Sequence, residues 1–149
     1  MQITDSPSSP VIGGAFRYAM PVRWGDQDAQ NHVNNTLYFR YVEEARVQLF
    51  RLAGISLPET RVGILAHASC DFLKPIVYPA TVVVVQVLTR VGRSSMAVDT
   101  VIERDDEPGV AYAKGSYVVV GADSNTGKSS PWTQIELAKF AKVFVAEQA

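Results

Sequence analysis

The chain has little cysteine, little net charge and no long apolar run. Cys70 is the single cysteine among 149 residues, which excludes an intramolecular disulfide. A lone thiol fits a reducing compartment, so we expect a cytoplasmic protein. The 14 Lys and Arg residues nearly balance the 15 Asp and Glu residues, so no overall field favours nucleic acid or an anionic membrane. Because no apolar stretch approaches the ~20 residues of a membrane-spanning helix, we expect no membrane partner.

Length and composition favour one domain. The first 14 residues are rich in Ser, Pro and Gly and lack the basic segment and apolar core of a secretion signal. We therefore predict a flexible tail over residues 1–14 and a single domain over residues 15–149. A hydrophobic content of 47% allows a chain of this length to bury a sizeable core.

The spacing of apolar residues predicts a strand followed by a long helix. Five apolar side chains at alternate positions indicate a half-buried strand: Phe16, Tyr18, Met20, Val22 and Trp24. Pro21 indicates an edge strand or a bulge. The helix is amphipathic, with Asn34 or Asn35 as its N-cap and Gly54 as its C-terminal stop.

The rest of the chain predicts strands joined by short turns. Strands are expected at residues 62–72, 81–91, 96–103 and 110–120, followed by a polar loop and a last helix. Ser130 is the expected N-cap of that helix, with Pro131 at its first position. This order indicates an α+β domain with a largely antiparallel sheet packed on one helix. Because one helix covers only part of a sheet, we expect a partner subunit.

The polar run from residue 24 to residue 35 is the most informative segment. It places Asp26, Asp28, His32, Asn34 and Asn35 at the start of the predicted helix. Unpaired backbone N–H groups and the positive end of the helix dipole lie there, and both suit a negative or polarisable ligand atom. Each residue alone is explained as a turn or cap residue, but together they exceed what an ordinary turn requires.

Several motif interpretations of this run fail. A phosphatase of the haloacid dehalogenase type expects Thr or Val two residues after the Asp pair, where Gln30 stands. An EF-hand loop beginning at Asp26 needs Gly and Glu where Asn31 and Leu37 stand. A metal held by the two Asp residues and the His lacks a second His or Cys nearby. We therefore expect no metal.

Polar residues around the turn after residue 91 form a second group of candidates. Arg90 and Arg93, with Ser94 beside them, suit a phosphate, and an ordinary solvated hairpin explains them equally well.

His67 and Cys70 are not a nucleophile and its base, because strand alternation places them on opposite faces of the sheet.

The run closely resembles the signature of hotdog-fold acyl-coenzyme A thioesterases of the hydroxybenzoyl-CoA thioesterase type. The matching segments are residues 22–29, 32–41, 44–46, 71–75 and 91–95. The resemblance implies an antiparallel five-stranded sheet wrapped around one long central helix, with a short C-terminal helix. It also implies a homodimer or homotetramer with active sites at the dimer interface.

The resemblance assigns roles to residues of the run. The catalytic acid of the family falls on Asp28, which would either attack the thioester carbon or hold a water molecule that does. His32 and Asn34 would orient the loop or the substrate, and Asn35 would supply a backbone N–H. Many relatives carry Gly where this chain has Asn31, and Asn tolerates the left-handed backbone better than most residues.

Substrate contacts are expected from a second set of residues: Tyr38, Arg90, Arg93 and Ser94. The two arginines would approach the nucleotide phosphates, and Tyr38 would line the pocket, although core packing also explains it. Coenzyme A is part of the acyl-CoA substrate, so no separate cofactor is expected. The alternative function is a non-catalytic protein that binds and senses acyl-CoA, because one fold serves many functions. A dehydratase would need a differently placed pair of His and Asp.

Overall fold

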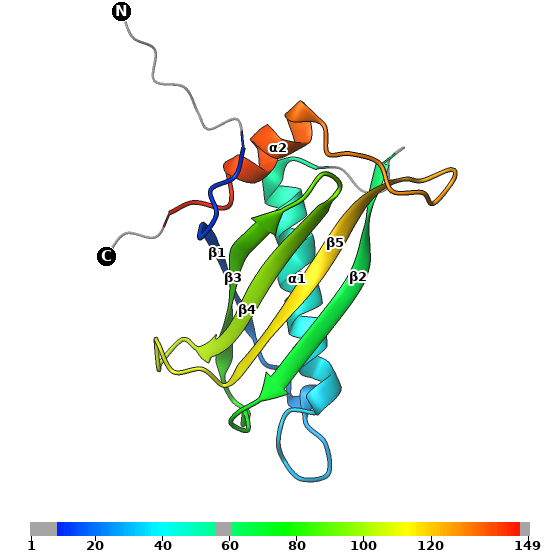
Figure 1. Cartoon of the computed structure of the whole chain (residues 1–149). Coiled ribbons are helices and arrows are strands. Elements are labelled where there is room, and N and C mark those ends of the chain that lie inside the picture. The colour runs from blue at the N-terminus through cyan, green and yellow to red at the C-terminus, as the bar shows by residue number, and fades with distance from the viewer. Residues whose placement is uncertain (1–8, 56–60, 147–149) are drawn as a thin grey trace, which may run out of the picture.

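The computed structural model describes residues 9–55 and 61–146. One antiparallel sheet has the strand order β1-β3-β4-β5-β2. Its strands are β1 (Ala15–Pro21), β2 (Arg61–Phe72), β3 (Thr81–Val91), β4 (Ser95–Arg104) and β5 (Ala113–Asp123). Helix α1 (Asn35–Ala53) runs along one face of the sheet, and α2 (Gln134–Ala141) lies at one end (Figure 1). The predicted α+β architecture is confirmed.

Helix α1 forms because buried side chains recur at helical spacing on one face. Tyr38, Tyr41, Ala45 and Leu49 are all buried against the sheet. The helix ends at Gly54, whose φ of 85° is the left-handed conformation that glycine adopts without strain. The predicted stop is confirmed.

The predicted tail lies partly outside the described residues, since residues 1–8 are not among them. The part that is described bonds to the sheet. Gly13 donates its N–H to the Leu88 carbonyl at 2.8 Å, and Leu88 donates to the Gly14 carbonyl at 2.9 Å.

Strand pairing fixes which loops share an end of the sheet. Pro21 pairs with Thr81, so the chain leaving β1 lies where β3 begins. The β3–β4 hairpin lies at the other end of β3, which has 11 residues and spans roughly 33 Å. The polar run and the hairpin with Arg90 therefore lie at opposite ends of one protomer, which Figure 1 also shows.

The two edge strands differ in length and cover. Strand β1 has 7 residues, whereas β2 has 12 and is exposed along most of its length. Ile64, Leu65 and Phe72 keep 41%, 45% and 42% of their surface in contact with solvent. A long apolar edge of this kind invites pairing with another chain.

Three boundary predictions are wrong. Strand β5 runs from Ala113 to Asp123 rather than over residues 110–120, because Val110 still belongs to the turn and donates its N–H to the Glu107 carbonyl. Strand β1 ends at Pro21, and Trp24 enters a short 3-10 turn in which it is 72% exposed rather than continuing the buried face. Helix α2 begins at Gln134 with Thr133 as its N-cap, not at Pro131 with Ser130. Thr133 and Glu136 form a capping box, which fixes the start of the helix three residues later than predicted.

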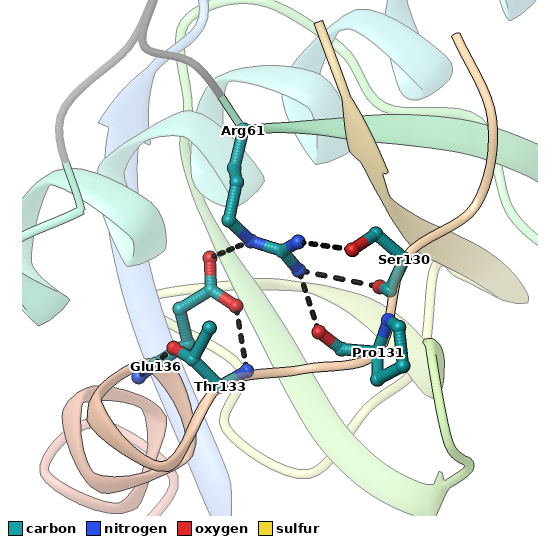
Figure 2. A network of polar contacts seen from close by, with 5 residues as sticks. All are labelled: Arg61, Ser130, Pro131, Thr133 and Glu136. Atoms are coloured by element: carbon teal, nitrogen blue, oxygen red, sulfur yellow. Dashed lines mark hydrogen bonds and ion pairs between the residues drawn. The ribbon is translucent and has the colours of Figure 1, made fainter. Parts of the chain in front are cut away.

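Ser130 is instead bound by an arginine from the edge strand (Figure 2). Arg61 donates from Nη1 to Ser130 Oγ at 2.7 Å and from Nη2 to the carbonyls of Ser130 and Pro131. Its Nε lies 2.9 Å from Glu136 Oε2. This network ties the start of β2 to α2.

Candidate functional site

The polar run folds back on itself as two short antiparallel segments, residues 26–28 and 32–34, which we call the first and second legs of the loop. Asp28 donates its N–H to the His32 carbonyl at 2.9 Å, and Asn34 donates to the Asp26 carbonyl at 2.9 Å. Val33 attaches the second leg to the chain before β3 by donating to the Ile76 carbonyl at 2.8 Å. The legs therefore hold Asp28 and the start of α1 on one compact unit.

The tip of this loop depends on Asn31. Its φ of 61° lies in the left-handed region, and its N–H donates to the Asp28 carbonyl at 3.0 Å. Asparagine adopts this conformation at less cost than most residues. The tolerance of asparagine for the left-handed region is therefore used at this position, where many relatives carry Gly.

Asp28 lies on the first leg with its side chain exposed. Its Oδ1 accepts the Gln30 N–H at 2.9 Å. Among the described residues, Oδ2 has no hydrogen-bond partner. One carboxylate oxygen thus orients the side chain while the other remains available.

The start of α1 leaves one amide available beside this loop. Asn34 caps the helix, because its Oδ1 accepts the Thr36 N–H at 2.9 Å and the Thr36 hydroxyl at 2.8 Å. The Leu37 N–H is bound by the Asn34 carbonyl at 2.8 Å. Within the described part of the chain the Asn35 N–H has no acceptor, as expected for a first helical position.

A small pocket opens next to this amide. Its volume is about 170 Å³. It is lined by His32, Val33, Asn35, Tyr38, Phe72, Leu73, Lys74 and Pro75. Three of the residues predicted for the site therefore share one pocket.

Tyr38 forms the buried wall of that pocket. It is 2% exposed, and its hydroxyl accepts the Ile76 N–H and donates to the Lys74 carbonyl, both at 3.2 Å. Burial raises the pKa of the Tyr38 phenol, and the bond from Ile76 only partly offsets that effect. The side chain serves as a neutral wall whose polar atom is already bonded.

A larger pocket of about 490 Å³ lies on the β1 side of α1. Its lining is Tyr18, Met20, Pro21, Arg23, Asp26, Leu37, Arg40, Tyr41 and Glu44. Asp28 lines neither pocket. Its carboxylate stands at the surface of the loop and not in a closed cavity.

The predicted phosphate-binding residues do not join this site within one protomer. Arg90, Arg93 and Ser94 belong to the β3–β4 hairpin at the other end of the sheet. There Arg90 Nη1 donates to Ser95 Oγ at 3.4 Å, and the Ser94 carbonyl accepts the Gly121 N–H at 2.7 Å. The polar loop and this hairpin are therefore separated by the length of β3.

Sequence reasoning missed one contact of the site, between Asp26 and Tyr41. The Tyr41 hydroxyl donates to Asp26 Oδ2 at 2.8 Å. Tyr41 stands on the core face of α1, so its place in the sequence indicates a packing role. Because 15 residues separate it from Asp26, no local pattern links the two. The available signal was chemical, because a buried tyrosine hydroxyl usually needs a partner.

Two further features bear on what the chain could bind. Among the described residues, no three His, Cys, Asp or Glu side chains are grouped as metal ligands would be. In the same residues, neither helix combines the length and apolar composition that a membrane crossing requires.

Known proteins identify the family. The model of the Thioesterase-like superfamily matches residues 22–142. A candidate thioesterase from Pseudomonas aeruginosa is 38% identical, with 79% of this chain and 92% of that chain covered and a TM-score of 0.77. A candidate acyl-CoA thioesterase from Xanthomonas campestris is 35% identical, covering 76% of this chain and 97% of that chain with a TM-score of 0.68.

A third structure supports the fold alone. A 1,4-dihydroxy-2-naphthoyl-CoA thioesterase from Synechocystis is 21% identical, covering 87% of this chain and 98% of that chain with a TM-score of 0.78. The family match covers the polar loop, α1 and the whole sheet except β1. The chain belongs to the Thioesterase-like superfamily and is a hotdog-fold thioester hydrolase.

Proposed function

We propose that the chain hydrolyses acyl-CoA thioesters, with Asp28 acting at the carbonyl carbon and the Asn35 N–H holding the carbonyl oxygen. One observation carries the proposal: Asp28 Oδ2 and the Asn35 N–H are unpaired among the described residues and belong to the same two-legged loop. Asp28 bonds to His32 across the loop, and Asn35 follows three residues after His32, at the first position of α1. A thioester bound at this loop would present its carbonyl carbon to the carboxylate and its carbonyl oxygen to the amide.

The Asn35 amide would stabilise the charge that develops on the carbonyl oxygen. The dipole of α1 adds to this effect because the amide stands at the helix N-terminus. Loss of one such donor typically costs about 3 kcal/mol in the transition state.

Two routes are open to Asp28. In the first, its carboxylate attacks the carbonyl carbon, the C–S bond breaks, the thiolate of coenzyme A leaves, and water then cleaves the mixed anhydride. In the second, it takes a proton from a water molecule that attacks the carbon, and the proton passes to the departing thiolate. Single-turnover hydrolysis in ¹⁸O-labelled water tests the first route, because water that attacks the carboxyl carbon of Asp28 in the anhydride leaves its oxygen in the protein, and the second route leaves none there.

We further propose that the complete site uses two protomers. The pocket of about 170 Å³ is smaller than the 300 Å³ or more of ordinary ligand sites. Pairing of two β2 edges about a two-fold axis would bring the hairpin end of one copy toward the loop end of the other, because the strands would run antiparallel. Arg90, Arg93 and Ser94 of the second copy would then approach the nucleotide.

A thiol-release assay with short-chain, medium-chain and aromatic acyl-CoAs tests the function. We expect Asp28→Asn to lower kcat by 100-fold or more, within the range typical of lost acid–base or nucleophilic groups. Asp26→Asn is the matched control, since it makes the same chemical change two residues away.

The assay also separates the enzyme from the alternative. Equal turnover in the wild type and Asp28→Asn would remove Asp28 from the mechanism. Binding of acyl-CoA by the wild type without thiol release would favour a sensing protein instead.

A further inference from the structure

Asp26 and the three groups that donate hydrogen bonds to it connect the polar loop to α1, and we call this set of contacts the junction. Its Oδ2 accepts the Tyr41 hydroxyl at 2.8 Å and the Arg23 N–H at 2.9 Å. Its carbonyl accepts the N–H of Asn34, the N-cap of α1, at 2.9 Å. Asp26, on the first leg, thus bonds to the second leg and to the body of the helix.

Tyr41 supplies the rigid side of this junction. It is 5% exposed and belongs to the core cluster that also holds Val22, Val33 and Ala45. Burial and the bond to Asp26 hold the pKa of its phenol far above the ordinary value, so the hydroxyl stays protonated and donating. A hydrogen bond to a charged acceptor is among the stronger kinds.

We propose that Tyr41 and Asp26 are positioning residues that hold the loop against α1, so that Asp28 and the Asn35 N–H can contact the same carbonyl group. The inference rests on the proposed function. Asp28 is two residues beyond Asp26, and Asn35 follows the residue that Asp26 binds through its carbonyl. Both reacting groups are therefore close along the chain to atoms that this junction fixes.

Small displacements explain why the junction matters for rate. A misplacement of about 1 Å can lower turnover about 100-fold even when substrate binding is kept. Without the Tyr41 hydroxyl, the one bond left to the Asp26 side chain from the described residues comes from the Arg23 N–H in its own turn. The first leg could then shift relative to the helix while the protein stays folded.

Four variants test the proposal by thiol release. Tyr41→Phe and Asp26→Ala are expected to lower kcat at least 10-fold and to change KM less than twofold. Asp26→Asn is expected to stay within threefold of wild type, because its amide oxygen still accepts from Tyr41 and Arg23. Tyr112→Phe is the matched control, since it also removes a tyrosine hydroxyl bonded to a carboxylate, that of Glu107 in the β4–β5 connection.

Amide hydrogen exchange gives a second readout that needs no turnover. Exchange at Asp28 and Asn34, whose N–H groups close the two legs, is expected to quicken at least 10-fold in Tyr41→Phe and not in Tyr112→Phe. Unchanged kcat and exchange in Tyr41→Phe would overturn the proposal. Inactivation of Asp26→Asn as complete as that of Asp28→Asn would also overturn it, because Asp26 would then act in the chemistry.

The two readouts separate this proposal from the proposed function. Faster exchange in Tyr41→Phe together with no thiol release from the wild type would overturn the hydrolysis and support the loop-holding role of Tyr41. Thiol release by the wild type together with unchanged exchange in Tyr41→Phe would support the hydrolysis and overturn the loop-holding role of Tyr41.

Discussion

The two ends of the sheet are held together in different ways. At the α2 end, Arg61 joins Glu136 and two carbonyls, and Phe140 lies between Phe50 and Trp132 with ring centroids 5.6 and 5.5 Å away. At the loop end, backbone bonds and the Tyr41 hydroxyl hold a segment whose polar side chains are largely exposed. Both ends have a buried core cluster, but the loop keeps unpaired groups at its surface for a ligand, as expected of a functional loop on a rigid scaffold.

The largest effect should come from the core of the α2 end. Phe140 is 1% exposed, so Phe140→Ala should lower the free energy of unfolding by about 3–5 kcal/mol. Because Phe140 is remote from the loop, kcat of the folded variant should stay within twofold of wild type. Urea denaturation and thiol release measure the two quantities, and a matching fall in kcat would show that the ends are not independent.

The Arg61–Glu136 pair should make the free energy of unfolding depend on pH in the acidic range. Burial tends to raise the pKa of the Glu136 carboxyl, but the bonds from Arg61 and Thr133 and the Arg61 charge outweigh it and lower the pKa. The stabilisation is therefore complete above the ordinary value of 4.5 and is lost as pH falls below it through the lowered pKa.

Glu136→Gln tests this assignment. It should cost about 1–2 kcal/mol at neutral pH, less than the 3–5 kcal/mol of a fully buried pair because both side chains keep some solvent contact. Denaturation between pH 3 and pH 7 should show a shallower acid slope for the variant. Equal slopes would assign the acid sensitivity to another carboxylate.

The smallest change in stability, but one with a loss of activity, should come from the helix cap. Asn34→Ala removes the acceptor for the Thr36 N–H, which should cost about 1 kcal/mol and loosen the start of α1. Unlike the α2-end variants, it should also lower kcat. Asn34→Asp keeps the acceptor and should restore both stability and rate, and failure of that rescue would mean that the amide group of Asn34 itself contacts the substrate.

Local patterns in the sequence predicted most of the fold. Strand β3 has the predicted bounds, and Asn34 and Gly54 cap α1 as expected, since these features depend on residues close in the chain. The start of α2 was missed although its signal is local, because the Ser-Pro pair at 130–131 was preferred to the Thr133–Glu136 capping box. Ser130 is instead bound by Arg61, 69 residues away.

Some of the local geometry of the candidate site also follows from residues that are close in the chain. The left-handed Asn31 and the available Asn35 N–H follow from local chemistry. The Tyr41–Asp26 bond and the separation of Arg90 from the loop depend on how β1, β3 and α1 pack. Periodicity along a single chain carries no information of that kind.

The hydrogen-bonded legs leave residues 29–31 outside the ladder, at the outer turn of the loop. Side-chain substitutions at that turn would alter what surrounds Asp28, while the Gln30 N–H that orients it and the contacts of Asp26 and Asn34 stay in place. Acyl preference could therefore diverge among descendants of this chain by changes at the turn alone, while the reacting groups keep their inherited arrangement.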